Sequence, residues 1–114
     1  MTDPEDQKII TLARSTRLRA RATEGAAVRD TDGRTYAAAT VDLPSLQLSA
    51  LRLAVAMAAS SGVDGLEAAA VTGAAAGAPE VSTDDLAAVR DLGGSGLSVF
   101  STDGDGTVVS ISTT

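Results

Sequence analysis

The residue types that usually carry chemistry are scarce in this sequence. Cysteine and histidine are both absent from the 114 residues, so the commonest zinc ligands and the commonest neutral-pH general base are missing. Carboxylates remain as metal ligands, and they favour Mg²⁺ or Ca²⁺. The segment Asp103-Gly104-Asp105-Gly106 could suggest a calcium loop. It lacks the later acidic ligand of such loops and lies between two β-type runs, so we expect a hairpin turn.

A basic segment near the N-terminus contrasts with the net charge of −6, which disfavours non-specific binding to nucleic acid. We interpret this segment as a solvated connection or as a source of intersubunit ion pairs. The alternative is a binding arm for an anionic partner such as RNA or an acidic protein surface. The arginines concerned are Arg14, Arg17, Arg19 and Arg21.

The elements that would position these residues can be predicted from local signals. Asp3 and Pro4 open a helix that we expect to fray near Ser15-Thr16. Two strands follow, 24–29 and 34–41, joined by the turn Asp30-Thr31-Asp32-Gly33. Further on, the patterns predict a strand over 66–72, a helix that Ser82 or Thr83 caps, and strands over 97–101 and 107–112.

The stretch 46–61 is apolar almost all round and predicts a helix with Ser45 as its N-cap. Such a helix should lie in the core or at a subunit interface, and the scarcity of aromatic residues leads us to expect an oligomer. Arg52 follows Ser49 by three residues, so both project from one side of this helix. A lone buried guanidinium is costly, and Arg52 therefore needs a partner or a route to water.

Several of these segments resemble the small, homotetrameric-type cytidine deaminases. Gly25-Ala26-Ala27, Asp32-Gly33 and Tyr36 match a strand, turn and aromatic strand of that family, and Ser49-Ala50-Leu51-Arg52 stands in place of its Cys-Ala-Glu-Arg. The resemblance implies one domain over residues 1–114. It also implies a three-layer α/β/α sandwich around a mixed five-stranded sheet, assembled as a dimer or tetramer.

The resemblance also implies which residues occupy the family's catalytic positions. Ser49 replaces one cysteine zinc ligand, Glu80 and Thr83 replace the other two, and Leu51 replaces the glutamate that shuttles protons. Serine is a poor zinc ligand beside cysteine or histidine, and leucine cannot transfer a proton. We therefore expect no zinc and no catalytic residue.

Two further roles follow from the same resemblance. Glu80 stands at a thiolate position that the family's arginine contacts, so we predict an Arg52–Glu80 ion pair joining two helix starts. The alternatives for Arg52 are a neighbouring subunit or water. Asp42 lies where the family holds ribose, and it could accept a hydroxyl hydrogen bond, face solvent or cap the helix.

We expect a catalytically inactive deaminase-like protein that acts by protein contacts as a homo-oligomer. The alternatives are a nucleoside- or nucleotide-binding module without turnover, and an RNA- or ribosome-associated factor that uses the arginine segment. The acidic N-terminus is unlike a signal peptide, and Gln47, Ser49 and Arg52 interrupt the longest apolar run. These features lead us to expect a cytoplasmic location without a membrane span.

Overall fold

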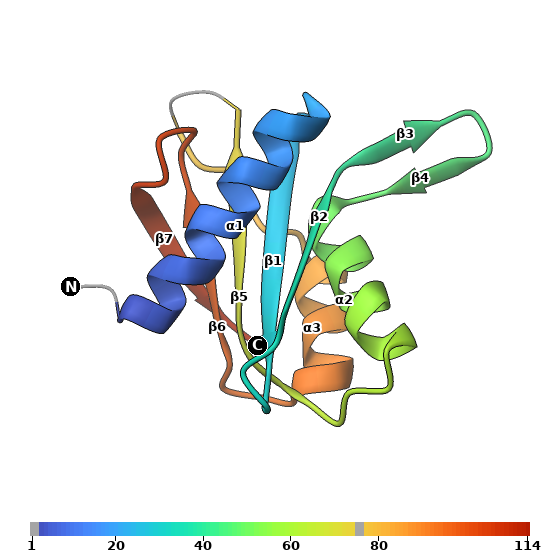
Figure 1. The fold of residues 1–114 in the computed structure, drawn as a ribbon, viewed down its shortest axis with the longest axis vertical. Coiled ribbons are helices and arrows are strands. Elements are labelled where there is room, and N and C mark those ends of the chain that lie inside the picture. Colours follow the sequence, from blue (N-terminus) through green and yellow to red (C-terminus); the bar gives the residue numbers. More distant parts are fainter. Residues whose placement is uncertain (1–2, 75–76) are drawn as a thin grey trace.

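A five-stranded sheet lies between two layers of helices in the computed structural model, which describes residues 3–74 and 77–114 (Figure 1). Helix α1 covers one face, and α2 and α3 cover the other (Figure 1). The predicted three-layer α/β/α sandwich is therefore confirmed. The elements are α1 (Pro4–Ala20), β1 (Glu24–Asp30), β2 (Thr35–Ala39), β3 (Val41–Leu43), β4 (Leu46–Leu48), α2 (Ala50–Ser60), β5 (Leu66–Gly73), α3 (Thr83–Gly93), β6 (Ser98–Thr102) and β7 (Val108–Thr113).

The sheet is mixed, as the sequence predicts. Its strand order is β2-β1-β5-β6-β7, and every neighbouring pair is antiparallel except β5 and β6. Helix α3 provides the crossover that parallel neighbours require. The carboxyl ends of β5 and β6 consequently lie at the same edge of the sheet, near the start of α3 (Figure 1).

Small residues fill both sides of the sheet. One core lies under α1 and joins Ile9, Ile10 and Phe100 to strand alanines. The other lies under α2 and α3 and is centred on Leu51, Val89 and Val99. Because the strand alanines are short, the helices can approach the sheet closely.

The β1–β2 turn is held by one buried carboxylate. Asp30 is 1% exposed and accepts hydrogen bonds from the backbone N–H groups of Asp32 and Arg34 and from the Tyr36 hydroxyl. Burial acts to raise the pKa of Asp30, but these hydrogen bonds hold it below its ordinary value. The predicted hairpin turn therefore forms, and a side chain fixes its shape.

Helix α1 continues beyond the predicted fraying point at Ser15-Thr16, so that prediction is wrong. It ends at Ala20, with Arg21 in the left-handed conformation as C-cap. The last two turns are stabilised by packing, because Thr16 and Arg17 are buried against the sheet. The local weakness of a Ser-Thr pair is thus overcome by tertiary contacts.

Helix α2 is shorter than the predicted 46–61 helix, and Ser45 is not its cap. Residues 41–48 instead form the β3–β4 hairpin, which projects from the body of the molecule (Figure 1). Ser49 caps α2 by accepting a hydrogen bond from the backbone N–H of Arg52. The helix buries one side in the core, and its outer side is exposed in this chain, with Met57 39% exposed.

The second half of the chain follows the sequence predictions closely. Ser82 caps α3, and β5, β6 and β7 form within two residues of the expected bounds. The Asp103–Gly106 segment is a turn in which the Asp103 side chain accepts hydrogen bonds from the backbone N–H groups of Asp105 and Thr107. Within the described residues, no helix has the length and apolar character that crossing a membrane requires.

Candidate functional site

Side-chain hydrogen bonds join the starts of α2 and α3. The Ser49 hydroxyl donates to Oδ1 of Asp85 at 2.8 Å and accepts the N–H of Arg52 at 3.1 Å. Asp85 is 9% exposed, and its own N–H is bonded to the Ser82 hydroxyl at 3.1 Å. Ser49 therefore caps α2, Ser82 caps α3, and the buried Asp85 connects the two caps.

The sequence predicted a connection between these helix starts but assigned it to the wrong residues. Within the described residues, the ion pairs are Lys8–Glu5 and a pair of contacts from Arg29 to Asp6 and Glu67. The predicted Arg52–Glu80 pair is not among them, and both side chains are exposed. Because the Arg52 side chain lies on the exposed side of α2, water solvates its charge and it needs no buried partner.

The remaining positions matched to the deaminase active site do not converge on a reactive centre. Leu51 is 1% exposed and packs in the core under α2. Glu80 and Thr83 are exposed, one before α3 and the other in its first turn. Of the four positions, only Ser49 makes a side-chain hydrogen bond that joins two elements among the described residues.

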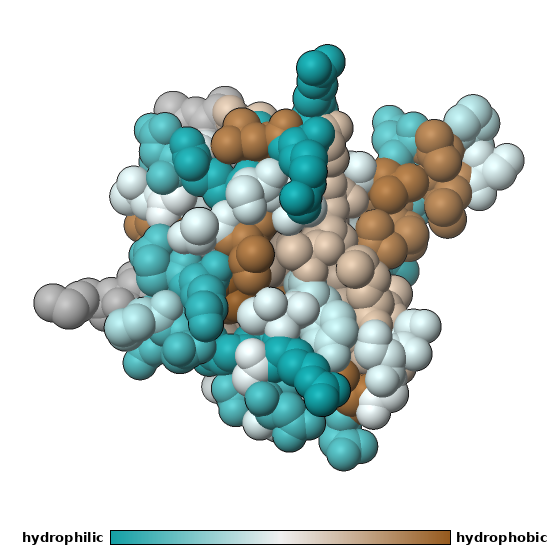
Figure 2. Space-filling model, in the orientation of Figure 1, coloured by the Kyte–Doolittle hydropathy of each residue, from teal (hydrophilic) through white to brown (hydrophobic). Residues whose placement is uncertain are grey.

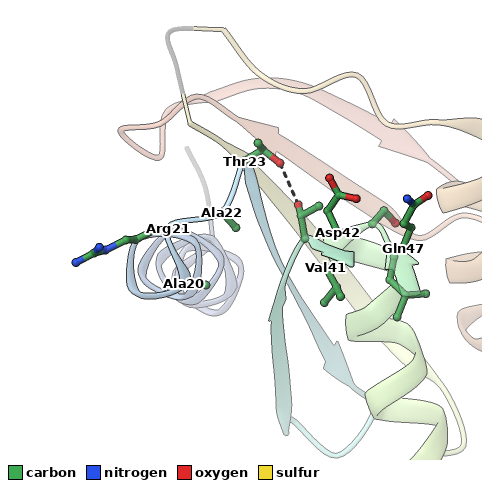
Figure 3. Close-up of a pocket in the computed structure, with 10 residues that line it drawn as sticks. Ala20, Arg21, Ala22, Thr23, Val41, Asp42 and Gln47 are labelled. Atoms are coloured by element: carbon green, nitrogen blue, oxygen red, sulfur yellow. Dashed lines mark hydrogen bonds between the residues drawn. The ribbon is translucent and has the colours of Figure 1, made fainter. Parts of the chain in front are cut away.

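A pocket of about 570 Å³ opens between the end of α1 and the β3–β4 hairpin (Figure 3). Asp42 and Gln47 are cross-strand partners in the hairpin, and their side chains lie next to each other at the pocket. Thr23 faces them and donates a hydrogen bond to Thr40, drawn as the dashed line in Figure 3. Ser49 is also among the lining residues, so the pocket adjoins the connection between α2 and α3.

The structure excludes one of the three roles that the sequence left open for Asp42. This side chain does not cap α2, because Ser49 has that role. It is exposed and lines the pocket, where its carboxylate can accept hydrogen bonds from hydroxyl groups. With Gln47 beside it, the wall offers both acceptors and donors.

Glu24 brings a second carboxylate close to Asp85. It begins β1 and lies on the face of the sheet that α2 and α3 cover, since it alternates with the buried Ala26. Burial, followed by repulsion from the Asp85 carboxylate, raises the pKa of Glu24 above its ordinary value. The site is therefore acidic, and its charge depends on pH.

The arginine segment is not an extended connection, because all of it but the C-cap lies within α1. Arg14 donates to the carbonyl of Gly104 at 2.9 Å, and Arg17 is 9% exposed. The Arg17 Nε is buried and has no hydrogen-bond partner among the described residues. Arg19 and Arg21 are exposed, and Arg21 points away from the hairpin in Figure 3. An anionic partner stays a prediction, supported by three exposed arginines, of which Arg14 is already bonded to the Gly104 carbonyl.

The sequence did not point to Asp85, Gln47 or Glu24 as members of this site. Asp85 carries a weak signal, because a carboxylate three residues after Ser82 is typical of a capped helix start. Its contact with Ser49 spans 36 positions of sequence, and no local pattern encodes it. Gln47 was hidden by the assignment of its segment to a helix.

Taken together, the sheet order and the helices on its two faces define a three-layer α/β/α protein. A family model described as cytidine deaminase-like matches residues 2–106, and the chain belongs to that family. The resemblance to the cytidine deaminases that the sequence suggested is therefore confirmed as family membership. A search of the curated proteins found no match to this sequence.

Solved structures agree on the fold. Cytidine deaminase from Burkholderia pseudomallei superposes with a TM-score of 0.83 at 24% identity, covering 99% of this chain and 93% of that one. The enzyme from Mycobacterium leprae gives 0.73 at 17% identity, covering 97% and 94%. A mutant enzyme from Mycobacterium tuberculosis gives 0.64 at 24% identity, covering 78% and 82%.

The residues present do not fit the zinc ion that the deaminase resemblance implies. The sequence supplies no thiolate or imidazole. The Ser49 hydroxyl is already engaged in two hydrogen bonds, and Thr83 has the same poor ligand chemistry. In the described parts of the chain, no three His, Cys, Asp or Glu side chains gather as a metal site would require.

Proposed function

We propose that this protein neither binds zinc nor deaminates cytidine, and that it acts through protein contacts as a homo-oligomer, either a dimer or a tetramer. The observation that carries the proposal is the hydrogen bond from Ser49 to Asp85. This bond, from the hydroxyl group of Ser49 to the carboxylate of Asp85, connects α2 to α3. A side-chain network of this kind requires no metal ion.

The burial of Leu51 supports the loss of deamination. The family's reaction needs a group that moves protons at this position, and a leucine side chain has none. Leu51 is fully enclosed by the core under α2, and it contributes to stability there. The position has thus become part of the packing.

The outer side of α2 supports the proposed oligomer. Two grooves with mainly apolar walls lie along α2: Met57 lines the groove towards Tyr36, and the other groove runs towards α3. The hairpin adds Leu43 and Leu46, which are 54% and 50% exposed, and its apolar surface is brown in Figure 2. Exposed apolar side chains gathered in this way are typical of a contact surface.

Native mass spectrometry and a cytidine deamination assay on the same preparation test this proposal. After incubation with zinc and removal of the excess, we expect a metal-free oligomer and no turnover. The enzyme from Burkholderia pseudomallei, handled identically, is the positive control. Stoichiometric zinc together with turnover would refute the loss of activity. A protein that is still monomeric at a concentration on the order of 100 μM, where even weakly associating chains pair, would refute the oligomer.

A second candidate function is the binding of a nucleoside-like ligand without turnover. The pocket of about 570 Å³, with Asp42 and Gln47 on one wall, is the observation that favours it. Cytidine and uridine at millimolar concentration should then raise the melting temperature. Asp42→Ala should abolish the shift, and Asp105→Ala, an exposed carboxylate in the β6–β7 turn, should preserve it. Equal shifts in both variants would exclude this pocket.

A further inference from the structure

The groove between α2 and α3 carries one charge on each wall. Its volume is about 460 Å³, and the residues that line it are apolar except for Arg52 on α2 and Asp91 on α3. Both charged side chains are exposed, and Arg52 is the one charged residue of α2. Neither of them takes part in an ion pair in the described part of the chain.

The two charges lie at different heights along the groove. Helices α2 and α3 pack side by side and begin at the same edge of the sheet, where the Ser49–Asp85 hydrogen bond joins their starts (Figure 1). Arg52 follows Ser49 by three residues, and Asp91 follows Asp85 by six. At about 1.5 Å per residue, Asp91 therefore lies about 4–5 Å farther along the groove, on the opposite wall.

These charges restrict what can fill the groove. An occupant that covers both walls takes Arg52 and Asp91 out of water, which is costly unless groups of opposite charge replace the water. The occupant must therefore bring an anion to Arg52 and a cation to Asp91. A wholly apolar ligand does not meet this requirement.

We propose that a second copy of this chain occupies the groove, so that Arg52 of each copy pairs with Asp91 of the other. The inference rests on the proposed homo-oligomer and assigns one of its contacts. The two copies are related by a two-fold axis perpendicular to the groove, midway between the two charges. Such an axis exchanges the two walls, so both charges gain a partner from a single contact. Met57 lines the other groove along α2 and is not part of this contact.

The residues between the charges fit this arrangement. The two-fold axis places α2 of each copy antiparallel against α3 of the other. Val55, three residues after Arg52, then lies opposite Ala88, three residues before Asp91, and both residues line the groove. The contact thus has an apolar centre with an ion pair on each side, and no second charge of α2 faces a like charge.

Charge reversal tests the contact. Arg52→Glu and Asp91→Arg each place like charges together at both pairs, so each should raise the dissociation constant roughly tenfold or more in sedimentation analysis. The first variant makes the net charge of −6 more negative by two, and the second makes it less negative by two. Weakening in both variants therefore excludes overall repulsion as the cause. Both changes suit the helix dipole, so the circular dichroism spectrum should stay that of the natural protein.

The combined variant Arg52→Glu/Asp91→Arg restores both pairs with the charges exchanged, and its dissociation constant should return to within about threefold of the natural value. Arg19→Glu, on the exposed part of α1, makes the same charge change as Arg52→Glu and should leave association unchanged. An oligomeric natural protein with unaffected single variants, or without recovery in the combined variant, would overturn this contact and leave the proposed oligomer standing. A monomeric natural protein would overturn both.

Discussion

A single hydroxyl group, that of Ser49, decides much of what the candidate site can do. It acts as acceptor to the first turn of α2 and as donor to a buried aspartate of α3. Both functions are structural, and together they use the donor and one acceptor site of the hydroxyl.

Ser49→Ala should therefore lower the free energy of unfolding by about 2 kcal/mol or more. About 1 kcal/mol comes from the lost helix cap, and the rest comes from leaving the Asp85 carboxylate buried without its hydroxyl partner. Urea unfolding measures the change. Ser45→Ala is the matched control, because Ser45 is exposed in the hairpin and should have little effect. A larger loss for the Ser45 variant would restore the longer helix that the sequence predicts.

Glu24 gives the site a predictable dependence on pH. Its raised pKa means that the folded protein holds this proton more tightly than the unfolded chain does. The full stability is present below the unfolded value, about 4.3, and part of it is lost as the pH rises through the folded pKa. Glu24→Gln removes the ionisation and with it this loss.

The melting temperature of the Glu24→Gln variant minus that of the natural protein should accordingly be larger at pH 7 than at pH 4. Calorimetry at the two pH values gives the comparison. Glu80→Gln, which removes an exposed carboxylate, should show the same difference at both. A Glu24 variant whose relative stability falls as the pH rises would contradict the assigned direction.

At the scale of elements, the approach of α1 to β1 depends on one glycine. A Cβ at Gly25 would lie 2.1 Å from the carbonyl oxygen of Ala13 and 2.8 Å from Cβ of Arg17. Both atoms belong to the helix, and the first is backbone, so neither can move alone. The helix therefore rests directly on the strand at this point.

Gly25→Ala should destabilise the protein by about 1–3 kcal/mol or more, since α1 must shift as a unit to admit the methyl group. Gly65→Ala is a suitable control, because its nearest neighbour would be the Thr31 methyl group at 3.3 Å, a side-chain atom that can yield. Chemical denaturation of both variants measures the difference. Similar stabilities would mean that α1 packs more loosely than the structure indicates.

Elements were predictable from the sequence where local signals and tertiary packing agree. The Ser82 cap and the β-branched runs of β6 and β7 gave correct elements, because nothing in the fold opposes them. The start of α2 was not predictable, since Ser45 and Ser49 are equally good caps and residues 46–48 are apolar in either conformation. The Ser49–Asp85 contact required the fold itself, because two helix starts far apart in sequence meet only after the sheet has formed.

At the scale of the whole molecule, the coverage of the sheet is uneven. The helices enclose β1, β2 and β5, and β7 is left open beyond β6. The outer side of α2 and the projecting hairpin are apolar as well. The proposed contacts between copies would bury such surfaces and stabilise the folded chain without adding residues.

The proposed contact on the outer side of α2 predicts that Met57→Lys weakens self-association. Full burial of a methionine side chain contributes about 1.5–3 kcal/mol, and Met57 is still 39% exposed in one chain, so losing the burial of that remainder should raise the dissociation constant of that contact roughly three- to sevenfold. The added lysine also reduces the net charge of −6, which by itself would favour association between copies. A decrease in subunit number therefore reports lost apolar contact and not increased repulsion. Thr11→Lys makes the same charge change on the exposed side of α1, and sedimentation analysis of the two variants separates the effects. If both variants associate as the natural protein does, α2 is not an interface, and its exposed methionine faces only water.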